Sequence, residues 1–329
     1  MSSRVSTRSI PDDWTGPIMT SPRLSGPVIA CLAALLLSPD ALFMRLSGMG
    51  GAQMLAWRAP SMALIFLFAW ALTSRRRAAD RASLLTGAGA TVMICQFGNN
   101  VLFPTGIALA PVAVMLMGVA TVPVWAAVLS RVLYGEATSR ATWVTIAAVL
   151  AGIALAVTGD TPVGLDGSSL LGALCGLCTA AALALNFVTL RHNPELPLLL
   201  AMGVGGLAAG LLGIALTGPA QMGDGAVWAI LVTGLFILPV SFFSLSYASR
   251  HTPAAVVSLF MLLETVLGPL WVWLGTGEAP SPRMLAGGAI VIGALALYLR
   301  HGAREKARGI RGREALEPGP QRPEPARGP

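Results

Sequence analysis

The feature that most constrains this chain is an internal repeat. Residues 110–114 (Ala-Pro-Val-Ala-Val) precede Gly135-Glu136, and residues 252–256 (Thr-Pro-Ala-Ala-Val) precede Gly277-Glu278, at a constant distance of 142 residues. The apolar stretches between these segments indicate an odd number of helices in each copy, so the second copy is expected to cross a membrane upside down. Inverted repeats of membrane helices are a recurring architecture of secondary transporters, whose solute site lies where the repeats meet.

The composition places the chain in a membrane. Of its 329 residues, 55% are hydrophobic and 11% are charged, whereas a soluble domain carries about 25% charged residues. A span needs about 20 mostly apolar residues, and this length predicts ten spans: 25–46, 51–72, 84–104, 110–133, 141–159, 168–190, 197–217, 226–248, 252–275 and 284–300. The expected fold is therefore an all-α polytopic membrane protein, with ten transmembrane helices arranged as two inverted five-helix repeats.

Four regions follow from this pattern. Residues 1–24 form a polar amino-terminal segment, 25–159 the first repeat, 168–300 the second repeat, and 301–329 a tail rich in proline, glycine and charge. Too little apolar surface is present in the tail to offset the entropy of ordering it, so it is expected to be disordered.

The arginines predict the orientation. Basic residues cluster at Arg75 to Arg81, at the turns containing Arg140, Arg191 and Arg250, and in the tail, and these segments alternate onto one side of the predicted bundle. Short basic loops stay in the cytoplasm, so both termini are expected there. The formal net charge of +7 then reflects topology rather than a nucleic-acid partner. The arginine-rich, lysine-poor composition indicates a plasma membrane, specifically a bacterial inner membrane.

Three ionisable residues lie well inside predicted spans: Asp40, Arg58 and Glu264. Such residues are costly in a membrane and are by default candidate functional sites. Asp40 and Arg58 lie at similar depth on consecutive helices, so they can form an ion pair. The pair could belong to a solute site, or it could only neutralise two charges and join the helices.

Polar residues of the third span extend this candidate site. Gln96, Asn99 and Asn100 lie at nearly the depth of Asp40 and Arg58. They are equally compatible with solute binding and with interhelical hydrogen bonds, which contribute about 0.6 kcal/mol each on average. Asn186, alone in the sixth span, is interpreted as such a structural hydrogen bond.

Glu264 lies near the middle of the ninth span. A lone ionised side chain costs at least about 2.5 kcal/mol at that depth, so Glu264 must be paired or protonated. It is a candidate proton carrier in a transport cycle. The alternative is a permanently neutral acid that forms a structural hydrogen bond.

Prolines and glycines indicate where the helices bend, end and pack. Pro123, Pro239 and Pro269 lie within spans, where each removes a backbone hydrogen bond and favours a kink. The Gly-x-x-x-Gly motifs of the sixth and seventh spans are interpreted as packing contacts. Met115, Met117, Phe242 and Phe243 are interpreted as core or lipid-facing residues rather than a ligand box.

The repeated Gly-Glu pairs have a structural interpretation. Gly135 and Gly277 are expected to end helices. Glu136 and Glu278 are then expected to cap the helices that follow, where the dipole favours negative charge.

With these residues in view, the chain resembles the drug/metabolite transporter superfamily, in particular the EamA type with two five-helix repeats. The resemblance rests on Trp57-Arg58, on Pro123 followed by Gly135-Glu136, and on Glu264 followed by Gly277-Glu278, over about residues 25 to 300. It implies a carrier of small solutes, commonly an exporter of metabolites, amino acids or drugs, in many cases driven by protons.

The resulting prediction is a secondary active transporter that works by alternating access, not an enzyme, with no cofactor and no metal site. Its expected partners are a small-molecule solute and the lipid bilayer, and a homodimer is left open. A membrane-embedded transferase and a channel are the alternatives. The transferase is disfavoured because the sequence has no metal-ligand cluster and no phosphate-binding loop, and His192, His251 and His301 lie at predicted cytoplasmic span ends.

Overall fold

The computed structural model describes residues 25–110, 112–157, 167–277 and 282–314, and these residues are helical, without strands. Among these described residues, seven helices are long and apolar enough to cross a membrane, and three shorter apolar helices correspond to the other predicted spans. The predicted all-α class is confirmed.

The elements, in chain order, are α1 (Gly26–Leu37), α2 (Asp40–Ser47), α3 (Gly51–Thr73), α4 (Arg77–Leu84), α5 (Gly87–Leu109), α6 (Val112–Val119), α7 (Val122–Tyr134), α8 (Arg140–Val157), α9 (Gly167–His192), α10 (Leu198–Thr217), α11 (Val227–Val232), the π-helix η1 (Thr233–Ile237), α12 (Leu238–His251), α13 (Ala254–Thr276) and α14 (Pro282–Glu314).

The internal repeat is visible in the helix boundaries. The starts of α6 and α13, Val112 and Ala254, are 142 residues apart, as are the ends of α7 and α13 and the starts of α8 and α14. One helix, α13, therefore corresponds to α6 and α7 together. The spacing found in short sequence fragments holds for whole elements.

The two repeats pack against each other symmetrically. Matching helices meet in the pairs α3 with α10, α7 with α13 and α8 with α14. The contact of α1 with α12 is mirrored by that of α9 with α5, in which the repeats exchange roles. This is the self-complementary pattern of a two-fold interface, and it builds the core from both repeats.

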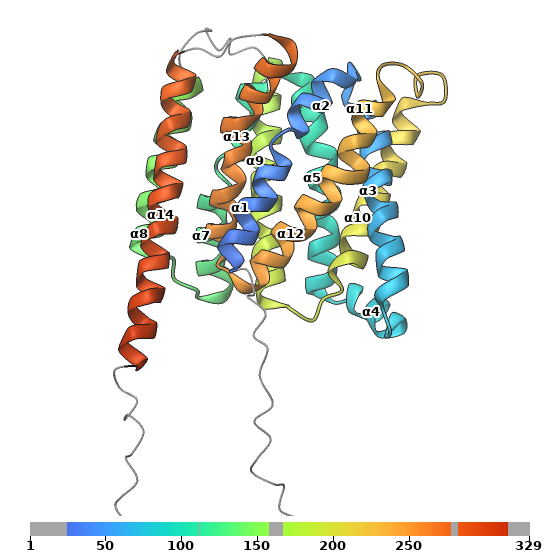
Figure 1. Cartoon of the computed structure of the whole chain (residues 1–329). Helices are drawn as coiled ribbons and strands as arrows, with labels where there is room; N and C mark the ends of the chain where they lie inside the picture. The colour runs from blue at the N-terminus through green and yellow to red at the C-terminus, as the bar shows by residue number, and fades with distance from the viewer. Residues whose placement is uncertain (1–24, 111, 158–166, 278–281, 315–329) are drawn as a thin grey trace, which may run out of the picture.

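The basic turns gather at one end of the bundle. The helix α4, the start of α1 and the end of α14 lie together at the bottom of Figure 1, where α9 ends in Arg191 and α12 in Arg250. We call this the arginine end. The first helix of one repeat leaves this end while its counterpart α9 runs toward it, which is the inversion that the sequence predicts.

Three of the predicted spans are interrupted rather than continuous. The span 25–46 is broken between α1 and α2 at Ser38-Pro39, the span 110–133 is broken between α6 and α7, and the span 226–248 contains the π-helix η1. Pro123 lies in the first turn of α7, where a proline nitrogen has no helical partner to lose, so it starts a new helical segment instead of bending a continuous helix. Pro239 directly follows η1 within one helix from Val227 to His251, so it lies beside the π-turn and does not start a separate helix.

The tail differs from expectation, whereas the ninth span is helical as expected. The helix α13 continues through position 269, and the kink at Pro269 stays a prediction. The last helix continues past residue 300 to Glu314, into residues for which the sequence predicts a disordered tail. Alanine, arginine, glutamate and lysine dominate this extension, and they are strong helix formers.

The helix α4 is an element that the apolar pattern does not predict. Ser74 and Trp70, at and near the end of α3, donate hydrogen bonds to the Asp80 carboxylate in α4. The Ser74 and Trp70 hydrogen bonds hold the pKa of Asp80 below its usual range. Asp80 thereby fastens α4 against the end of α3.

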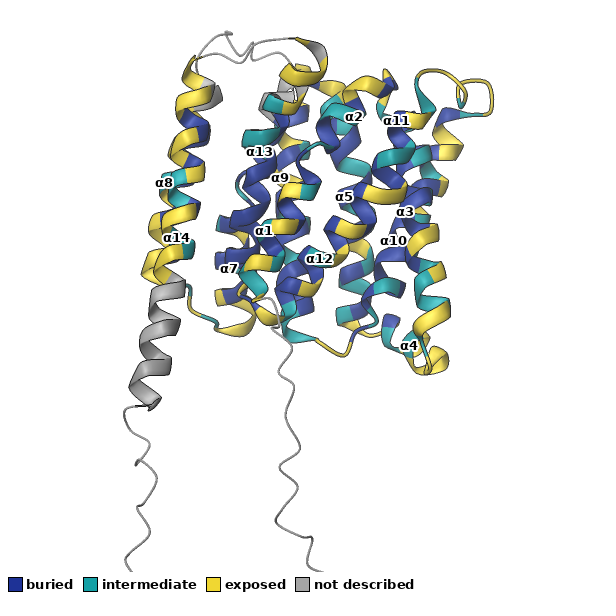
Figure 2. Cartoon of the chain, viewed as in Figure 1, coloured by how far each residue is buried: buried dark blue, intermediate teal, exposed yellow. Residues whose placement is uncertain are grey.

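The bundle buries its core and exposes an apolar exterior. Figure 2 shows buried residues along the inner faces of the helices. On α3 the outer face carries Leu64, Phe68 and Leu72, which are 61 to 70% exposed. Large apolar patches of this kind are rare on soluble monomers, and here they provide a surface for lipid.

Glycines allow the close approach of α3 and α10. A Cβ added to Gly210 would lie 2.3 Å from Cγ of Pro60, and one added to Gly206 would lie 3.2 Å from Cε of Met62. The predicted packing role of the Gly206-x-x-x-Gly210 motif is confirmed.

We expect Gly210→Ala to destabilise the bundle. Overpacking against the Pro60 ring costs about 1–3 kcal/mol, which exceeds the roughly 1 kcal/mol gained by replacing glycine with alanine in a helix. The control is Gly98→Ala in α5, where an added Cβ meets nothing within 4 Å. Thermal unfolding in detergent should show a lower midpoint for Gly210→Ala only, and equal midpoints would contradict the packing assignment.

Candidate solute site

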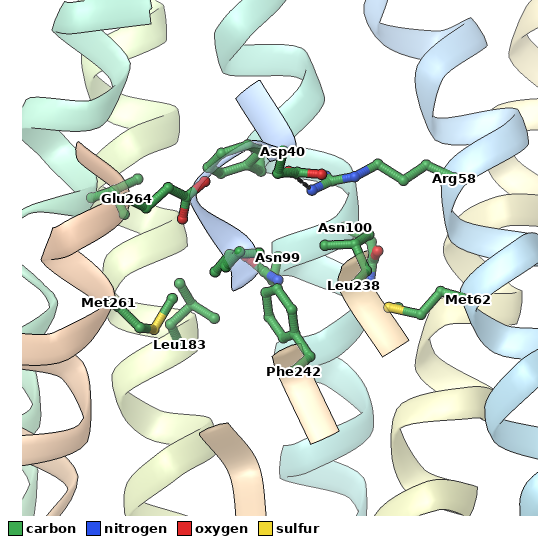
Figure 3. A pocket seen from close by; sticks show the side chains of 13 residues that line it. Asp40, Arg58, Met62, Asn99, Asn100, Leu183, Leu238, Phe242, Met261 and Glu264 are labelled. Atoms are coloured by element: carbon green, nitrogen blue, oxygen red, sulfur yellow. Dashed lines mark hydrogen bonds and ion pairs between the residues drawn. The ribbon is translucent and has the colours of Figure 1, made fainter. Parts of the chain in front are cut away.

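A pocket lies in the core of the bundle, between helices of both repeats. Its cavity volume is about 20 Å³, room for little more than a water molecule, so the pocket is nearly closed in this conformation. Its walls are Leu37, Asp40, Arg58, Met62, Asn99, Asn100, Phe103, Val119, Leu183, Leu238, Phe242, Met261 and Glu264. The structure thus brings together five of the six residues that the sequence predicts for solute binding and proton coupling (Figure 3).

The helix interruptions converge on this pocket. Leu37 and Asp40 flank the break between α1 and α2, Val119 ends α6, and Leu238 follows η1. Interrupted backbone is tolerated at membrane depth only where protein buries it or where it lines a cavity. The sites of backbone disruption and the site of polar side chains therefore coincide.

Asp40 and Arg58 form a buried ion pair across the pocket wall. Arg58 donates to Oδ2 of Asp40, and the two residues are 5% and 0% exposed. Asp40 begins α2, where the helix dipole stabilises a negative charge. The guanidinium carbon of Arg58 lies 5.4 Å from the ring centroid of Phe103, a cation–π distance.

The π-helix holds Arg58 in place. A Cβ added to Gly234 in η1 would lie 3.0 Å from the Arg58 carbonyl oxygen and 2.9 Å from Cβ of Ser61. A larger residue at 234 would push α3 away, so this glycine sets the distance between the two helices. π-Turns occur frequently at functional sites, and this one packs against α3 at Arg58.

The ion pair leaves hydrogen-bonding atoms unused. Within the described part of the chain, Oδ1 of Asp40 and Nε of Arg58 are buried and have no hydrogen-bond partner. An unsatisfied buried polar atom costs about 1–3 kcal/mol. A purely structural pair would be expected to use these atoms, whereas a binding site would keep them for a ligand.

Glu264 faces the pair from α13, in the other repeat. It is 6% exposed and lies at the same level as Asp40 and Arg58 in Figure 3. The ion pairs among the described residues join Arg58 to Asp40 and not to Glu264. The pocket thus contains two acids and one base.

Of the three predicted amide side chains of α5, two line the pocket and one lies outside it. Asn99 and Asn100 line the pocket, and the Asn100 amide donates to the Gln96 carbonyl oxygen. Gln96 is 1% exposed and lies one turn beyond the lining, toward the arginine end. Gln96, which the sequence predicts as a solute-binding residue, therefore does not line the pocket.

An apolar tier lies on the arginine side of the charged residues. Figure 3 shows Met62, Leu183, Phe242 and Met261 at a lower level than Asp40, Arg58 and Glu264. Phe242 is buried in the hydrophobic core, as the sequence predicts, and it also lines the pocket. The helical spacing carried the signal for this tier, because Met62 follows Arg58 by four residues and Met261 precedes Glu264 by three.

The repeated Gly-Glu pairs are confirmed in part. Gly135 and Gly277 end α7 and α13 with φ of 67° and 79°, in the left-handed region that favours glycine. Glu278 lies outside the described residues, as does Pro111.

The prediction that Glu136 caps the following helix is wrong. Arg191 of α9 pairs with Glu136 at 2.8 Å and His192 lies 3.4 Å from it, while Ser139 receives the hydrogen bond at the start of α8. The pair joins the two repeats at the arginine end. The sequence does not reveal it, because the partners are 55 residues apart.

Asn186 also differs from its prediction. The interpretation as interhelical hydrogen bonding requires a partner, yet both amide atoms of Asn186 are buried without one in the described part of the chain. The residue is 2% exposed.

Comparisons with known proteins agree with this architecture. No curated protein sequence matches the chain, whereas 21 chains of solved structures do. One of these, described as a crystal structure of a protein, has a TM-score of 0.68 at 19% identity and covers 90% of this chain and 99% of its own length. At that identity the likeness shows the fold alone.

The sequence model of the EamA-like transporter family matches residues 170–300. That range is the second of the two predicted repeats, and it contains Glu264. The second repeat is therefore similar to the EamA-like transporter family, and the chain has several apolar helices long enough to cross a membrane.

Proposed function

We propose that the protein is a proton-coupled secondary transporter that exports small organic solutes through the pocket at the repeat interface. The observation that carries this proposal is the placement of Glu264 opposite the Asp40–Arg58 pair, in a pocket built from both repeats. Inverted-repeat transporters bind their solutes in such a position.

Charge balance supports the coupling. The Asp40–Arg58 pair is neutral, so an ionised Glu264 would leave one uncompensated negative charge in the pocket. An isolated charge at membrane depth costs at least about 2.5 kcal/mol. Glu264 can be neutralised by a proton when the pocket is empty and by a cationic group of the solute when it is full. Solute and proton would then exchange at one carboxyl group.

The lining favours a small solute with both polar and apolar parts. Asn99, Asn100 and the unused atoms of Asp40 and Arg58 offer hydrogen bonds. Met62, Phe242 and Met261 offer apolar contact. An anionic group of the solute could draw Arg58 away from Asp40, which would place a proton or a cation on the released acid.

The same proposal explains the cross-repeat contacts at both ends of the bundle. At the arginine end Glu136, which lies between α7 and α8, pairs with Arg191 of α9. At the opposite end the Gln53 amide of α3 donates to the Gln221 and Asp224 carbonyl oxygens, at 2.8 and 2.6 Å. Alternating access requires the contacts at one end to separate in one phase of the cycle and the contacts at the other end to separate in the other phase. We place the arginine end in the cytoplasm, following the positive-inside rule.

Glu264→Gln tests the proton role. In proteoliposomes with an internal pH-sensitive dye, screened against metabolites, amino acids and drugs, we expect solute-induced proton flux to fall at least about tenfold, because the variant cannot carry the proton that neutralises the site. Glu195→Gln, which changes an exposed acid, is the matched control. Full proton flux in Glu264→Gln would exclude this carboxyl as the coupling group.

A double substitution separates binding from structure at the ion pair. Arg58→Gln alone should reduce stability by about 3–5 kcal/mol, because it leaves Asp40 buried without its partner. Adding Asp40→Asn should recover most of that loss. If the pair binds solute, transport in the double variant should still be at least about tenfold below wild type, since a charge-assisted hydrogen bond is worth about 1.5–3 kcal/mol. Recovery of both stability and transport would leave the pair a purely structural role.

A further inference from the structure

We propose that the solute pathway continues past the pocket, toward the arginine end, through a second polar layer that is closed in this conformation. The layer consists of Gln96, Asn186, Ser246 and Ser258, one residue from each of α5, α9, α12 and α13. This inference rests on the proposed transport function and extends it to residues outside the pocket.

The register of the helices places these four residues in one layer. Each of the four lies three or four residues from a pocket-lining residue of its own helix, on the side of the arginine end. The pairs are Gln96 with Asn99, Asn186 with Leu183, Ser246 with Phe242, and Ser258 with Met261. Residues at this spacing share a helix face and lie one turn apart. Because α9 contacts α5, α12 and α13, Asn186 lies on the helix that the other three helices share.

The burial and the missing partners of these side chains point to a ligand. Gln96, Asn186, Ser246 and Ser258 are each at most 2% exposed. In the described part of the chain, Nε2 of Gln96, both amide atoms of Asn186 and the Ser246 hydroxyl have no hydrogen-bond partner. Only the Ser258 hydroxyl has one, donating to the Ala255 carbonyl oxygen of its own helix at 3.0 Å. Native proteins satisfy nearly all buried polar groups, so a layer with four unpartnered atoms indicates groups that are satisfied in another state.

The other side of the pocket lacks such a layer. One turn from the lining in the opposite direction, α5 has Gly106 and Ile107, η1 has Gly234 and Leu235, and α13 has Leu267 and Gly268. The unpartnered Thr179 of α9 is the one polar residue at these positions. The polar layer therefore lies on one side of the pocket only, the side on which Glu136 pairs with Arg191.

The chemistry of the layer limits what it can accept. It carries hydroxyl and amide groups and no ionisable side chain, so it can hydrogen-bond to water and to the polar groups of a solute without compensating a net charge. The apolar tier of Met62, Leu183, Phe242 and Met261 separates it from Asp40, Arg58 and Glu264. A charged solute would therefore leave the pocket only after its charge is balanced, for example together with a proton.

Cysteine accessibility tests the pathway without requiring transport. With Cys31, Cys95, Cys175 and Cys178 replaced by alanine, single cysteines are introduced at Asn186 and Ser246. The control is Ala184→Cys, fully buried on nearly the opposite face of α9. A membrane-impermeant methanethiosulfonate reagent is added from each side, in the otherwise unchanged protein and with Glu136→Ala, which removes the closing pair.

We expect the cysteines at 186 and 246 to react from the arginine side about tenfold or more faster than the cysteine at 184, because only hydrated positions supply the reactive thiolate. Removal of Glu136 should increase the difference. Reaction as slow as at position 184 in both backgrounds would overturn the proposal. Labelling is independent of proton coupling, so this result and the Glu264→Gln result can fail separately.

Asn186→Leu provides the second readout. If Asn186 only holds helices together, the leucine variant should be less stable than wild type. If it lines a pathway, an apolar residue of similar volume removes unpartnered groups, so thermal stability should be kept or raised, while transport falls at least about tenfold from the loss of hydrogen bonds to the solute. Asn186→Ser should retain transport. Loss of stability in Asn186→Leu, or wild-type transport in that variant, would overturn the proposal.

Discussion

The interaction on which the core of this bundle depends is the ion pair between Asp40 and Arg58, because neither charge can remain in a hydrocarbon environment alone. Its geometry requires several distant features at once. The break at Pro39 starts α2 with Asp40 in its first turn, and Gly234 in the π-helix lets α12 and α3 approach at Arg58. Trp271 of α13 donates to the Ser38 hydroxyl at 2.8 Å, which fixes the break itself. Both repeats therefore contribute to the position of one ion pair.

The symmetry of the helix packing does not extend to the charged residues of the pocket. The repeats match in helix boundaries and in pairwise packing, and this symmetry places a shared interface along the axis of the bundle. The charged residues of the pocket do not follow this symmetry. Asp40 and Arg58 come from the first repeat and Glu264 from the second, and the helix interruptions occur at different helices in the two copies. Symmetric packing supplies two related scaffolds, and the charged residues of the pocket lie asymmetrically between them.

Sequence reasoning succeeded where a single residue or a short spacing carries the physical cost. Asp40, Arg58 and Glu264 were identifiable because a charge within an apolar run is expensive wherever its partners lie. The helix-ending glycines were identifiable because few residues adopt positive φ. Glu136 and Asn186 were misinterpreted for the opposite reason. Their roles depend on whether a group from another helix lies within about 3 Å, as a hydrogen bond requires, and local spacing contains no information about that.

By itself the sequence determined the environment, the helical class, the repeat and the residues whose burial would be costly, because hydropathy, period and charge act on each segment separately. Only the tertiary structure decided which of those residues share a pocket, that the interrupted helices end there, and that Glu136 joins the repeats instead of capping a helix. It also decided that buried polar atoms of Gln96, Asn186 and Ser246 have no hydrogen-bond partner in the described part of the chain. These outcomes depend on the contact of faces from helices far apart in the chain. A contact energy of this kind is set by the packing of the whole bundle and not by any one segment.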